Sequence, residues 1–474
     1  MSFDARKMSL DIPGDWSFTK ISDIAGINES SISSDDSFDY IRYIDISSVS
    51  SDKMETPKLM RLDDAPSRAK RIIKQGDIII STVRPNLKQF YLCNFEIDNH
   101  IVSTGFCVVS PKSSKYRWYL YSFLTSEIFT EYLIRVADGA AYPAFSYKEI
   151  RDAIIPLPSD EYLSFISSTS KSIFNKVHLN QQTNETLEAM AQAIFKSWFV
   201  DFDPVRAKIE ATSAGRDPNR AAMAAISACT KVSADGAVLW EETEAALQQK
   251  LDRMSADQRT QLRQTAELFP GELVKSEIGE VPKGWEYDQL GNFITVKRGG
   301  SPRPIKDFVV EEGLHWTKIS DATSENSPFI MTTKEFIKED GLKKTVLLEK
   351  GSLILSNSAT PGLPKFLNID ACIHDGWLYF PEQEHFTDLY LYHLFIEIRK
   401  ALVAKGSGTV FTNLKTSILR NYDVVVPNGE LVIKFTEVAH SIFDSLLNNR
   451  EETESLTKLR DTLLPKLISG EFEL

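Results

Sequence analysis

The chain carries an internal repeat, which limits the fold more than any other feature of the sequence. The stretch "IPGDW" ends at Trp16, and a similar stretch, "VPKGW", ends at Trp285, 269 residues later. The same spacing relates Leu187 to Leu456. Shared phrases occur in the same order in both halves, such as "QGDIIIS" and "KGSLILS". Matches in one order at nearly one spacing indicate a duplicated unit.

Each repeat opens with a region that mixes short strands and helices. Runs such as "DIIISTV" and "NYDVVVP" are bounded by Gly, Asn or Pro, which is typical of strands. The stretch "RWYLYSFLTSEIFTEYLIRVA" is helical in its periodicity. We expect an α+β fold: two tandem globular α/β domains, separated by two long antiparallel coiled-coil helices, with the pseudo-twofold symmetry of an internal duplication. The expected boundaries are a first domain at 1–160, a spacer helix at 161–204, a helical connector at 205–280, a second domain at 281–430 and a second spacer helix at 431–474.

Both repeats continue into a helix whose apolar residues recur at alternating spacings of four and three. This alternation is typical of a narrow seam between two paired helices. The first helix, at about 30 residues, would be roughly 45 Å long, too long for its own small domain to cover. An ordinary long surface helix is the alternative. The residues expected at helix or subunit contacts are Ile173, Val177, Leu187, Ile194, Phe195, Trp198, Phe199, Leu446, Leu456, Leu463 and Leu467.

Trp198 and Phe199 end the first helix with a large apolar surface. We expect the other helix, the other globular unit or another chain to cover them, since aromatic residues at a helix end commonly mark an interface. The Ala-rich and acidic helical stretch that follows, Val205 to Glu280, has no counterpart in the second repeat. It is either a linker or a docking surface for a partner.

Composition and motifs argue against an enzyme. The chain has no Gly-Lys dipeptide, so it lacks a nucleotide-hydrolysing P-loop. Its four cysteines are far apart and form no CxxC, and we expect His100, His315 and His374 to be loop or surface residues, not metal ligands. We therefore expect no catalytic residues and no metal. Without a signal core or a long apolar run, a cytoplasmic protein with no membrane contact is expected.

The formal net charge of −12 argues against a protein that coats nucleic acid by charge alone. Basic and amide residues nevertheless gather in loops at matching places of the two repeats. Arg can bond guanine bidentately, and Lys can hold phosphates. Turns with solvated cations are the alternative. The DNA-binding candidates are Arg42, Arg68, Arg84, Asn86, Lys88, Tyr142, Ser146 and Lys148 in the first repeat and Lys297, Arg298, Ser301, Arg303, His315, Lys318, Lys365, Ser407, Thr409, Asn413 and Lys415 in the second.

Three motifs resemble the specificity subunit of type I restriction–modification systems: "FKSWFVDFDPVRAKIE", "LFPGELVKSEIGEVPKGW" and "LRDTLLPKLISGEFEL". The resemblance implies two target recognition domains that each read half of a bipartite, asymmetric DNA sequence. It also implies that the helices form an antiparallel spacer and bind two methyltransferase (modification) subunits, with Trp198, Phe199 and Leu463 to Glu471 facing them.

The resemblance further implies that this chain holds no cofactor. S-adenosylmethionine, ATP and Mg would be bound by partner subunits, including restriction subunits that form an ATP-driven nuclease. Two other functions stay open. A scaffold whose globular units bind proteins would show no DNA affinity above a neutral control. A cryptic enzyme would show turnover as a single purified chain.

We predict that the helices set the distance between two half-sites. Removing one turn of the first helix, Asn180 to Thr183, should change the separation of the half-sites and leave the bases of each unchanged. Exchanging the first globular unit should instead change one half-site. Methylome sequencing of cells that carry each variant measures both outcomes, and an unaltered separation would reject the spacer role.

Overall fold

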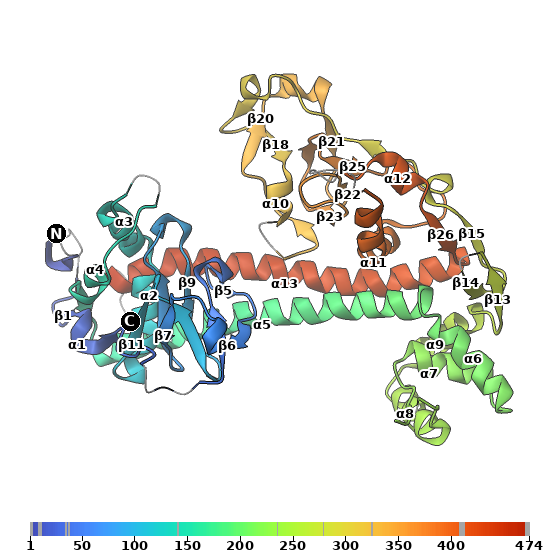
Figure 1. Ribbon diagram of the computed structural model, residues 1–474, viewed down its shortest axis with the longest axis horizontal. Coiled ribbons are helices and arrows are strands. Elements are labelled where there is room, and N and C mark those ends of the chain that lie inside the picture. Colours follow the sequence, from blue (N-terminus) through green and yellow to red (C-terminus); the bar gives the residue numbers. More distant parts are fainter. Residues whose placement is uncertain are drawn as a thin grey trace. The chain divides into compact units, whose positions relative to one another are not determined.

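A computed structural model describes residues 3–7, 12–33, 36, 38–139, 142–234, 236–277, 279–323, 326–406 and 413–469. The chain divides into two compact units. Unit 1 consists of Met1–Gln182 and Asn449–Leu474, and unit 2 consists of Thr183–Asn448. Each unit therefore contains parts of both repeats, because the two longest helices, α5 (Asp160–Phe199) and α13 (Gly429–Ser469), each contribute to both (Figure 1).

Unit 1 contains two four-stranded sheets. One has the order β2 (Ala25–Ile27), β11 (Phe106–Pro111), β8 (Ile78–Ser81) and β9 (Phe90–Leu92). The other has the order β6 (Lys58–Arg61), β3 (Tyr40–Ile44), β10 (His100–Ser103) and β7 (Ala69–Ile72), with β3 and β10 parallel. Smaller elements complete it: α1 (Ile21–Ile24), the β4–β5 pair (Val49–Ser50, Lys53–Met54), α2 (Ser114–Leu124), α3 (Glu127–Val136) and α4 (Tyr147–Arg151).

Unit 2 repeats this arrangement with an added edge strand in each sheet. One sheet has the order β16 (Lys297–Arg298), β25 (Trp377–Tyr379), β22 (Leu353–Ser356), β23 (Pro364–Leu367) and β19 (Phe329–Ile330). The other has the order β17 (Val309–Val310), β20 (Glu335–Ile337), β18 (Leu314–Thr317), β24 (Ala371–Ile373) and β21 (Val346–Leu348), with β18 and β24 parallel. Its helices include α10 (Ile319–Thr323), α11 (Asp388–Gly406) and α12 (Thr416–Arg420).

The structure confirms the internal duplication. In unit 1, β1 (Ser17–Lys20) pairs antiparallel with β12 (Ile154–Leu157), and Ser17 lies opposite Leu157. In unit 2, β15 (Glu286–Gln289) pairs with β26 (Asp423–Val426), and Glu286 lies opposite Val426. Both residues of the second pair lie 269 positions after their counterparts in the first pair, which is the spacing of the repeat. The sequence matches that lie between the two paired strands of each unit depart from that spacing, and unit 2 contains the added edge strands β17 and β19 in this region.

The helices α5 and α13 pack antiparallel within each unit, as the apolar stripe predicted. In unit 1, Asn180 Nδ2 donates to the backbone oxygen of Asn449 at 3.3 Å and to Glu452 Oε2 at 2.9 Å. In unit 2, Asn184 Nδ2 donates to the backbone oxygen of Leu446 at 3.0 Å, and Phe195 packs against Phe435. These two amides are polar residues within the otherwise apolar contact between the helices, and such groups tend to fix the register of paired helices.

The first helix is longer than the expected 30 residues. α5 contains 40 residues, and α6 (Asp203–Ser213) begins after a short break. Phe202 adopts a left-handed φ of 56°, and Pro204 lies in the first turn of α6, where its missing N–H is tolerated. The change in backbone direction at Phe202 therefore ends the helix before residue 204.

The connector is a small helical module that belongs to unit 2. It consists of α6, α7 (Pro218–Ile226), α8 (Trp240–Asp252) and α9 (Ala256–Leu268). Met223, Leu247, Leu251 and Ala266 share a core of their own. The connector is not helical throughout, because it ends in the hairpin of β13 (Leu273–Ser276) and β14 (Gly279–Pro282).

The turn between β4 and β5 brings a buried carboxylate to α13 in unit 1. Asp52 is 7% exposed and forms an ion pair with Arg460 Nη1 at 2.7 Å. The Tyr121 hydroxyl donates to the other carboxylate oxygen. Burial raises the pKa of Asp52 to about 6, although the Arg460 guanidinium opposes this rise.

We predict a pH-dependent stability of unit 1 that depends on Asp52. Because its pKa is higher in the folded than in the unfolded chain, where it is about 3.9, this carboxyl stabilises the fold below about pH 4. About 3 kcal/mol of the free energy of unfolding is lost as the pH rises through 6. Asp52→Asn should lack this component in urea unfolding at pH 4 to 7, whereas the exposed control Asp63→Asn should keep it. Parallel pH profiles for Asp52→Asn and wild type would contradict the assignment.

Candidate nucleic-acid interface

In both units, candidate binding residues gather where the paired parallel strands end. The carboxyl ends of parallel strands meet at one edge of a sheet, so the segments after β3 and β10 in unit 1 lie together. In unit 1, Asp45 directly follows β3. Its Oδ2 accepts hydrogen bonds from Arg68 Nη2 at 2.6 Å and from the Tyr43 hydroxyl at 2.9 Å. Burial raises the pKa of Asp45, but hydrogen bonds from Ser47, Tyr43 and Arg68 outweigh it and lower the pKa to about 2.

A cation and an exposed aromatic ring extend this edge of unit 1. Arg84 follows β8 with a left-handed φ of 50°, and its guanidinium carbon lies 4.3 Å from the centre of the Tyr142 ring. Tyr142 is 68% exposed. Two backbone hydrogen bonds connect the loop after β10 to its neighbours. Thr104 N donates to the Arg68 oxygen, and Thr82 N donates to the Gly105 oxygen, both at 2.8 Å. We call this surface, made of Arg68, Arg84 and Tyr142, the first loop surface.

The remaining unit 1 candidates lie elsewhere or already have partners. Arg42 pairs with Asp98, which precedes β10, so it points toward the opposite edge of the sheet. Lys88 pairs with Glu127 at 2.5 Å. The Ser146 hydroxyl caps α4 by accepting a hydrogen bond from the Lys148 amide, which is a structural role within unit 1. Exposed side chains remain at Asn86 and Lys148.

In unit 2, Asp375 organises the basic loop that follows β16. Its carboxylate accepts from Ser301 Oγ at 2.7 Å and from Arg303 Nη2 at 3.3 Å, and its backbone oxygen accepts from Arg298 Nε at 2.5 Å. The Ser301 hydrogen bond, followed by the charges of the neighbouring cations, lowers the pKa of Asp375. A Cβ at Gly299 would lie 2.4 Å from the His374 backbone oxygen. This glycine thus lets the loop approach the end of β24, a reason that the sequence did not reveal.

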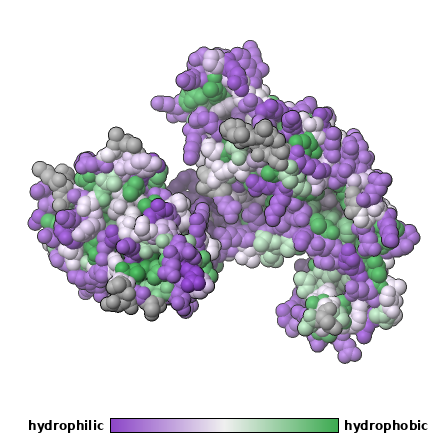
Figure 2. All heavy atoms as spheres, viewed as in Figure 1, coloured by the Kyte–Doolittle hydropathy of each residue, from purple (hydrophilic) through white to green (hydrophobic). Residues whose placement is uncertain are grey.

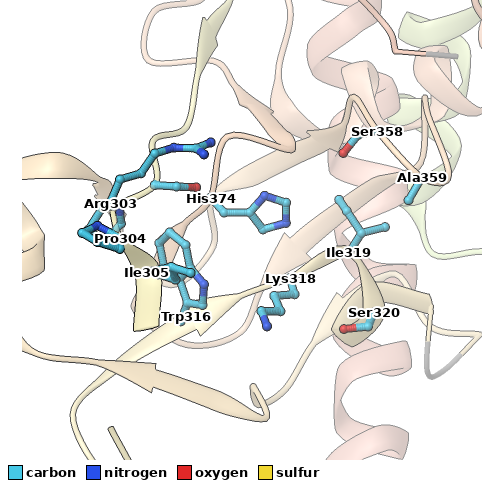
Figure 3. Close-up of a pocket in the computed structure, with 12 residues that line it drawn as sticks. Arg303, Pro304, Ile305, Trp316, Lys318, Ile319, Ser320, Ser358, Ala359 and His374 are labelled. Atoms are coloured by element: carbon cyan, nitrogen blue, oxygen red, sulfur yellow. The ribbon is translucent and has the colours of Figure 1, made fainter. Parts of the chain in front are cut away.

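An open cavity of about 890 Å³ lies beside this loop. Its wall combines cations, aromatic rings and hydroxyl groups (Figure 3). Lys318, which directly follows β18, lines it and pairs with Glu335 at 2.5 Å. In the part of unit 2 that contains β18 and β20, Figure 2 shows a small hydrophobic patch surrounded by hydrophilic residues. The lining residues are Ser301, Pro302, Arg303, Pro304, Ile305, Trp316, Lys318, Ile319, Ser320, Ser358, Ala359 and His374.

Several unit 2 candidates lie away from this cavity. Lys365 on β23 is 5% exposed and donates to the Ser327 backbone oxygen, which corrects the expectation that it faces DNA. His315 Nδ1 is 2.9 Å from Thr333 Oγ1, and its ring contacts Phe336. The exposed candidates outside the cavity are Lys297, Arg298, Asn413 and Lys415. Ser407 and Thr409 lie outside the described residues.

Sequence reasoning missed three residues of these sites. Asp45 and Asp375 are not among the residues that the loop pattern of basic and amide side chains predicted, yet each one positions an arginine. His374 lies in the loop between β24 and β25, as expected, but its place in the lining of the cavity was not predicted. The phrases "RYIDIS" and "HWTKIS" could have drawn attention to the positions of Asp45 and Lys318, because each follows its strand at the same place in the repeat.

The aromatic end of α5 is buried inside unit 2. Trp198 is 3% exposed and contacts Phe269 and Phe435. Phe199 is 6% exposed and contacts Tyr390. The helix α13 and the globular part of the second repeat therefore cover both rings, which is one of the expected arrangements. Neither ring is exposed toward a methyltransferase subunit, as the resemblance had implied. Of the other proposed contact residues, those buried are Ile173, Phe195, Leu446 and Leu467, and those half-buried are Val177, Leu187, Ile194, Leu456 and Leu463.

Other apolar side chains of the two long helices are exposed. Met190 on α5 is 50% exposed, and Leu459 on α13 is 48% exposed. These two residues occupy equivalent positions in the repeat. Among the described residues, no helix combines the length and hydropathy needed to span a bilayer, and no three His, Cys, Asp or Glu side chains form a group that could hold a metal ion.

Known proteins share this sequence pattern. Residues 13–189 match the family model for the type I restriction modification DNA specificity domain. The chain is 30% identical over 453 residues to the type I restriction enzyme HindI specificity subunit of Haemophilus influenzae, covering 90% of this chain and 94% of that protein. It is 23% identical to the MjaIX specificity subunit of Methanocaldococcus jannaschii, covering 78% and 72% of the two chains.

Solved structures also align with most of the chain. The HsdS subunit from Thermoanaerobacter tengcongensis aligns with a TM-score of 0.33 and 18% identity, covering 97% of this chain and 98% of that one. The S subunit of a type I restriction–modification system from M. genitalium aligns with a TM-score of 0.43 and 14% identity, covering 97% and 99%.

Proposed function

This chain belongs to the DNA specificity subunits of type I restriction–modification systems, and on that basis we propose that its two globular units read the two halves of one asymmetric DNA target. As a specificity subunit it is a non-catalytic component that supplies DNA sequence recognition to an assembly with methyltransferase subunits. The bipartite target, the number of partner subunits and the residues that touch DNA are the parts that we propose.

This proposal rests on one observation: the two units share the same arrangement of strands, but different side chains occupy equivalent positions at the strand ends. Arg84 in unit 1 and Ala359 in unit 2 follow equivalent strands with left-handed φ angles of 50° and 57°. Asp45 follows β3, whereas Lys318 follows the equivalent β18. Because donors and acceptors differ at matching positions, the two units favour different base edges. The target should therefore not be palindromic.

The net charge of the chain supports a complex in which partner subunits also contact the DNA phosphates. A net charge of −12 leaves too few cations for tight binding by phosphate contacts alone. Arg68 and Arg303 are both partly neutralised by the carboxylates that position them. We infer that this chain contributes base recognition and that methyltransferase subunits supply much of the phosphate contact.

One pair of exposed apolar residues at equivalent positions, Met190 and Leu459, supports two copies of one partner. Met190 and Leu459 are equivalent in the repeat, so two identical methyltransferase subunits would meet the same kind of contact on α5 and α13. We propose that these subunits bind S-adenosylmethionine, and that restriction subunits, which would bind ATP and Mg, join the same assembly. DNA as the substrate implies a cytoplasmic location.

Reconstitution tests the proposed function. The chain, co-expressed with its methyltransferase, should form a complex that methylates one split, asymmetric sequence, which sequencing of methylated genomic DNA would identify. The methyltransferase alone serves as the control and should methylate no defined sequence. A complex that forms but shows no defined target would favour a protein-binding scaffold instead.

We predict that Met190 contacts one methyltransferase subunit and that Leu459 contacts the other. Met190→Asp and Leu459→Asp should each lower the number of bound subunits from two to one, because a charge in an apolar contact is costly to desolvate. Native mass spectrometry of the reconstituted complex measures the stoichiometry. The exposed Leu347→Asp, on β21 of unit 2, is the matched control and should keep both subunits. Full occupancy in both helix variants would contradict the assignment.

A further inference from the structure

The cavity of unit 2 contains a histidine whose hydrogen-bonding state is set by the backbone. The Gly376 amide donates to His374 Nδ1 at 2.7 Å. A nitrogen that accepts from an N–H group carries no proton, so the neutral ring holds its proton on Nε2. No hydrogen-bond partner for Nε2 occurs in the described part of the chain. The ring therefore lines the cavity with a free N–H donor (Figure 3).

The position of this ring depends on the absence of a side chain at residue 376. A Cβ at Gly376 would lie 2.1 Å from His374 Cε1 and 2.7 Å from its Nδ1. Any larger residue would push the ring away from its place. The backbone at Gly376 thus both accommodates the ring and selects its tautomer.

The charges around the cavity favour a neutral ligand. Lys318 pairs with Glu335 at 2.5 Å, and Arg303 pairs with Asp375 at 3.3 Å. Each lining cation is therefore balanced by a carboxylate. Burial lowers the pKa of His374; the Asp375 carboxylate opposes this and Lys318 adds to it, and the net lowering leaves the ring uncharged near neutral pH. A phosphate would find little net positive charge here, whereas a nucleobase edge needs none.

The apolar part of the wall also suits a base. Trp316, which is itself only 2% exposed, packs beside the His374 ring with the ring centres 6.1 Å apart, and the half-buried Ile305 and the buried Ile319 line the same cavity. Aromatic and aliphatic groups make favourable contacts with base faces and with the thymine methyl group. Together with the fixed donor, they form a site for a heteroaromatic ligand that offers an acceptor.

We propose that His374 is a specificity-determining residue of unit 2, which donates its Nε2–H to an acceptor atom of one base in the half-site that this unit reads. The acceptors of this kind in the major groove are guanine N7 and O6, adenine N7 and thymine O4. This inference rests on the proposed function and deepens it by naming one base contact. It predicts a change in sequence preference, not a uniform loss of affinity.

The test compares variants of the complex on a library in which every position of both half-sites is randomised. His374→Phe keeps a ring but removes the donor, and it should reduce discrimination at one base pair of one half-site by roughly five- to fifteen-fold. Gly376→Ala, which displaces the ring, should have the same effect. His374→Gln keeps a donor and should retain most of the discrimination. His440→Phe, at an exposed histidine on α13, is the control and should match wild type.

The outcomes separate this inference from the proposed function. An unchanged preference in His374→Phe, beside a wild-type complex that methylates a split target, would overturn the role of His374 alone. Affinity that falls equally for all sequences would indicate a phosphate contact and would also overturn it. A wild-type complex with no defined target would reject the proposed function itself. An intact preference at the other half-site shows that a variant is folded.

Discussion

The exchange of helix ends between the two repeats is the constraint on which the rest of the structure depends. The end of α5, from the first repeat, buries Trp198 in the core of unit 2. The end of α13, from the second repeat, buries Leu467 in the core of unit 1. These two residues are equivalent in the repeat. Each globular unit is therefore completed by the helix of the other repeat, and large aromatic or aliphatic side chains stabilise each junction through burial.

Because of this exchange, the elements that stabilise each unit are distinct from the loops that we propose read DNA. Strand pairings such as β1–β12 and β15–β26 recur at one spacing, and the loops at the ends of the parallel strands differ. In unit 1 these loops present Arg84 and Tyr142, and in unit 2 they enclose a cavity with His374. Strands that are held in place by buried helix ends can tolerate changes in the loops, because surface substitutions seldom alter the free energy of unfolding by much.

Periodic features of the fold were predictable, and the surroundings of single residues were not. The repeat and the antiparallel seam followed from spacing, because an apolar stripe at intervals of four and three faces a partner helix whatever its identity. Lys365 was expected on the surface, yet it lies in the interior on β23, where its ammonium group donates a hydrogen bond to the Ser327 backbone oxygen. The basic loop after β16 was identified, but its anchoring by Asp375, far along the sequence, was not.

The sequence by itself determined that the chain contains two related units joined by paired helices and that it belongs to a family of DNA specificity subunits. Repeats, periodicity and motifs are patterns of residues along the chain, so they can be recognised from the sequence without the structure. Only the tertiary structure decided what covers Trp198 and which carboxylate holds each arginine, and it alone placed His374 in a cavity with a fixed proton. Those properties arise from contacts between residues distant in sequence, and their energies depend on burial that no single segment specifies.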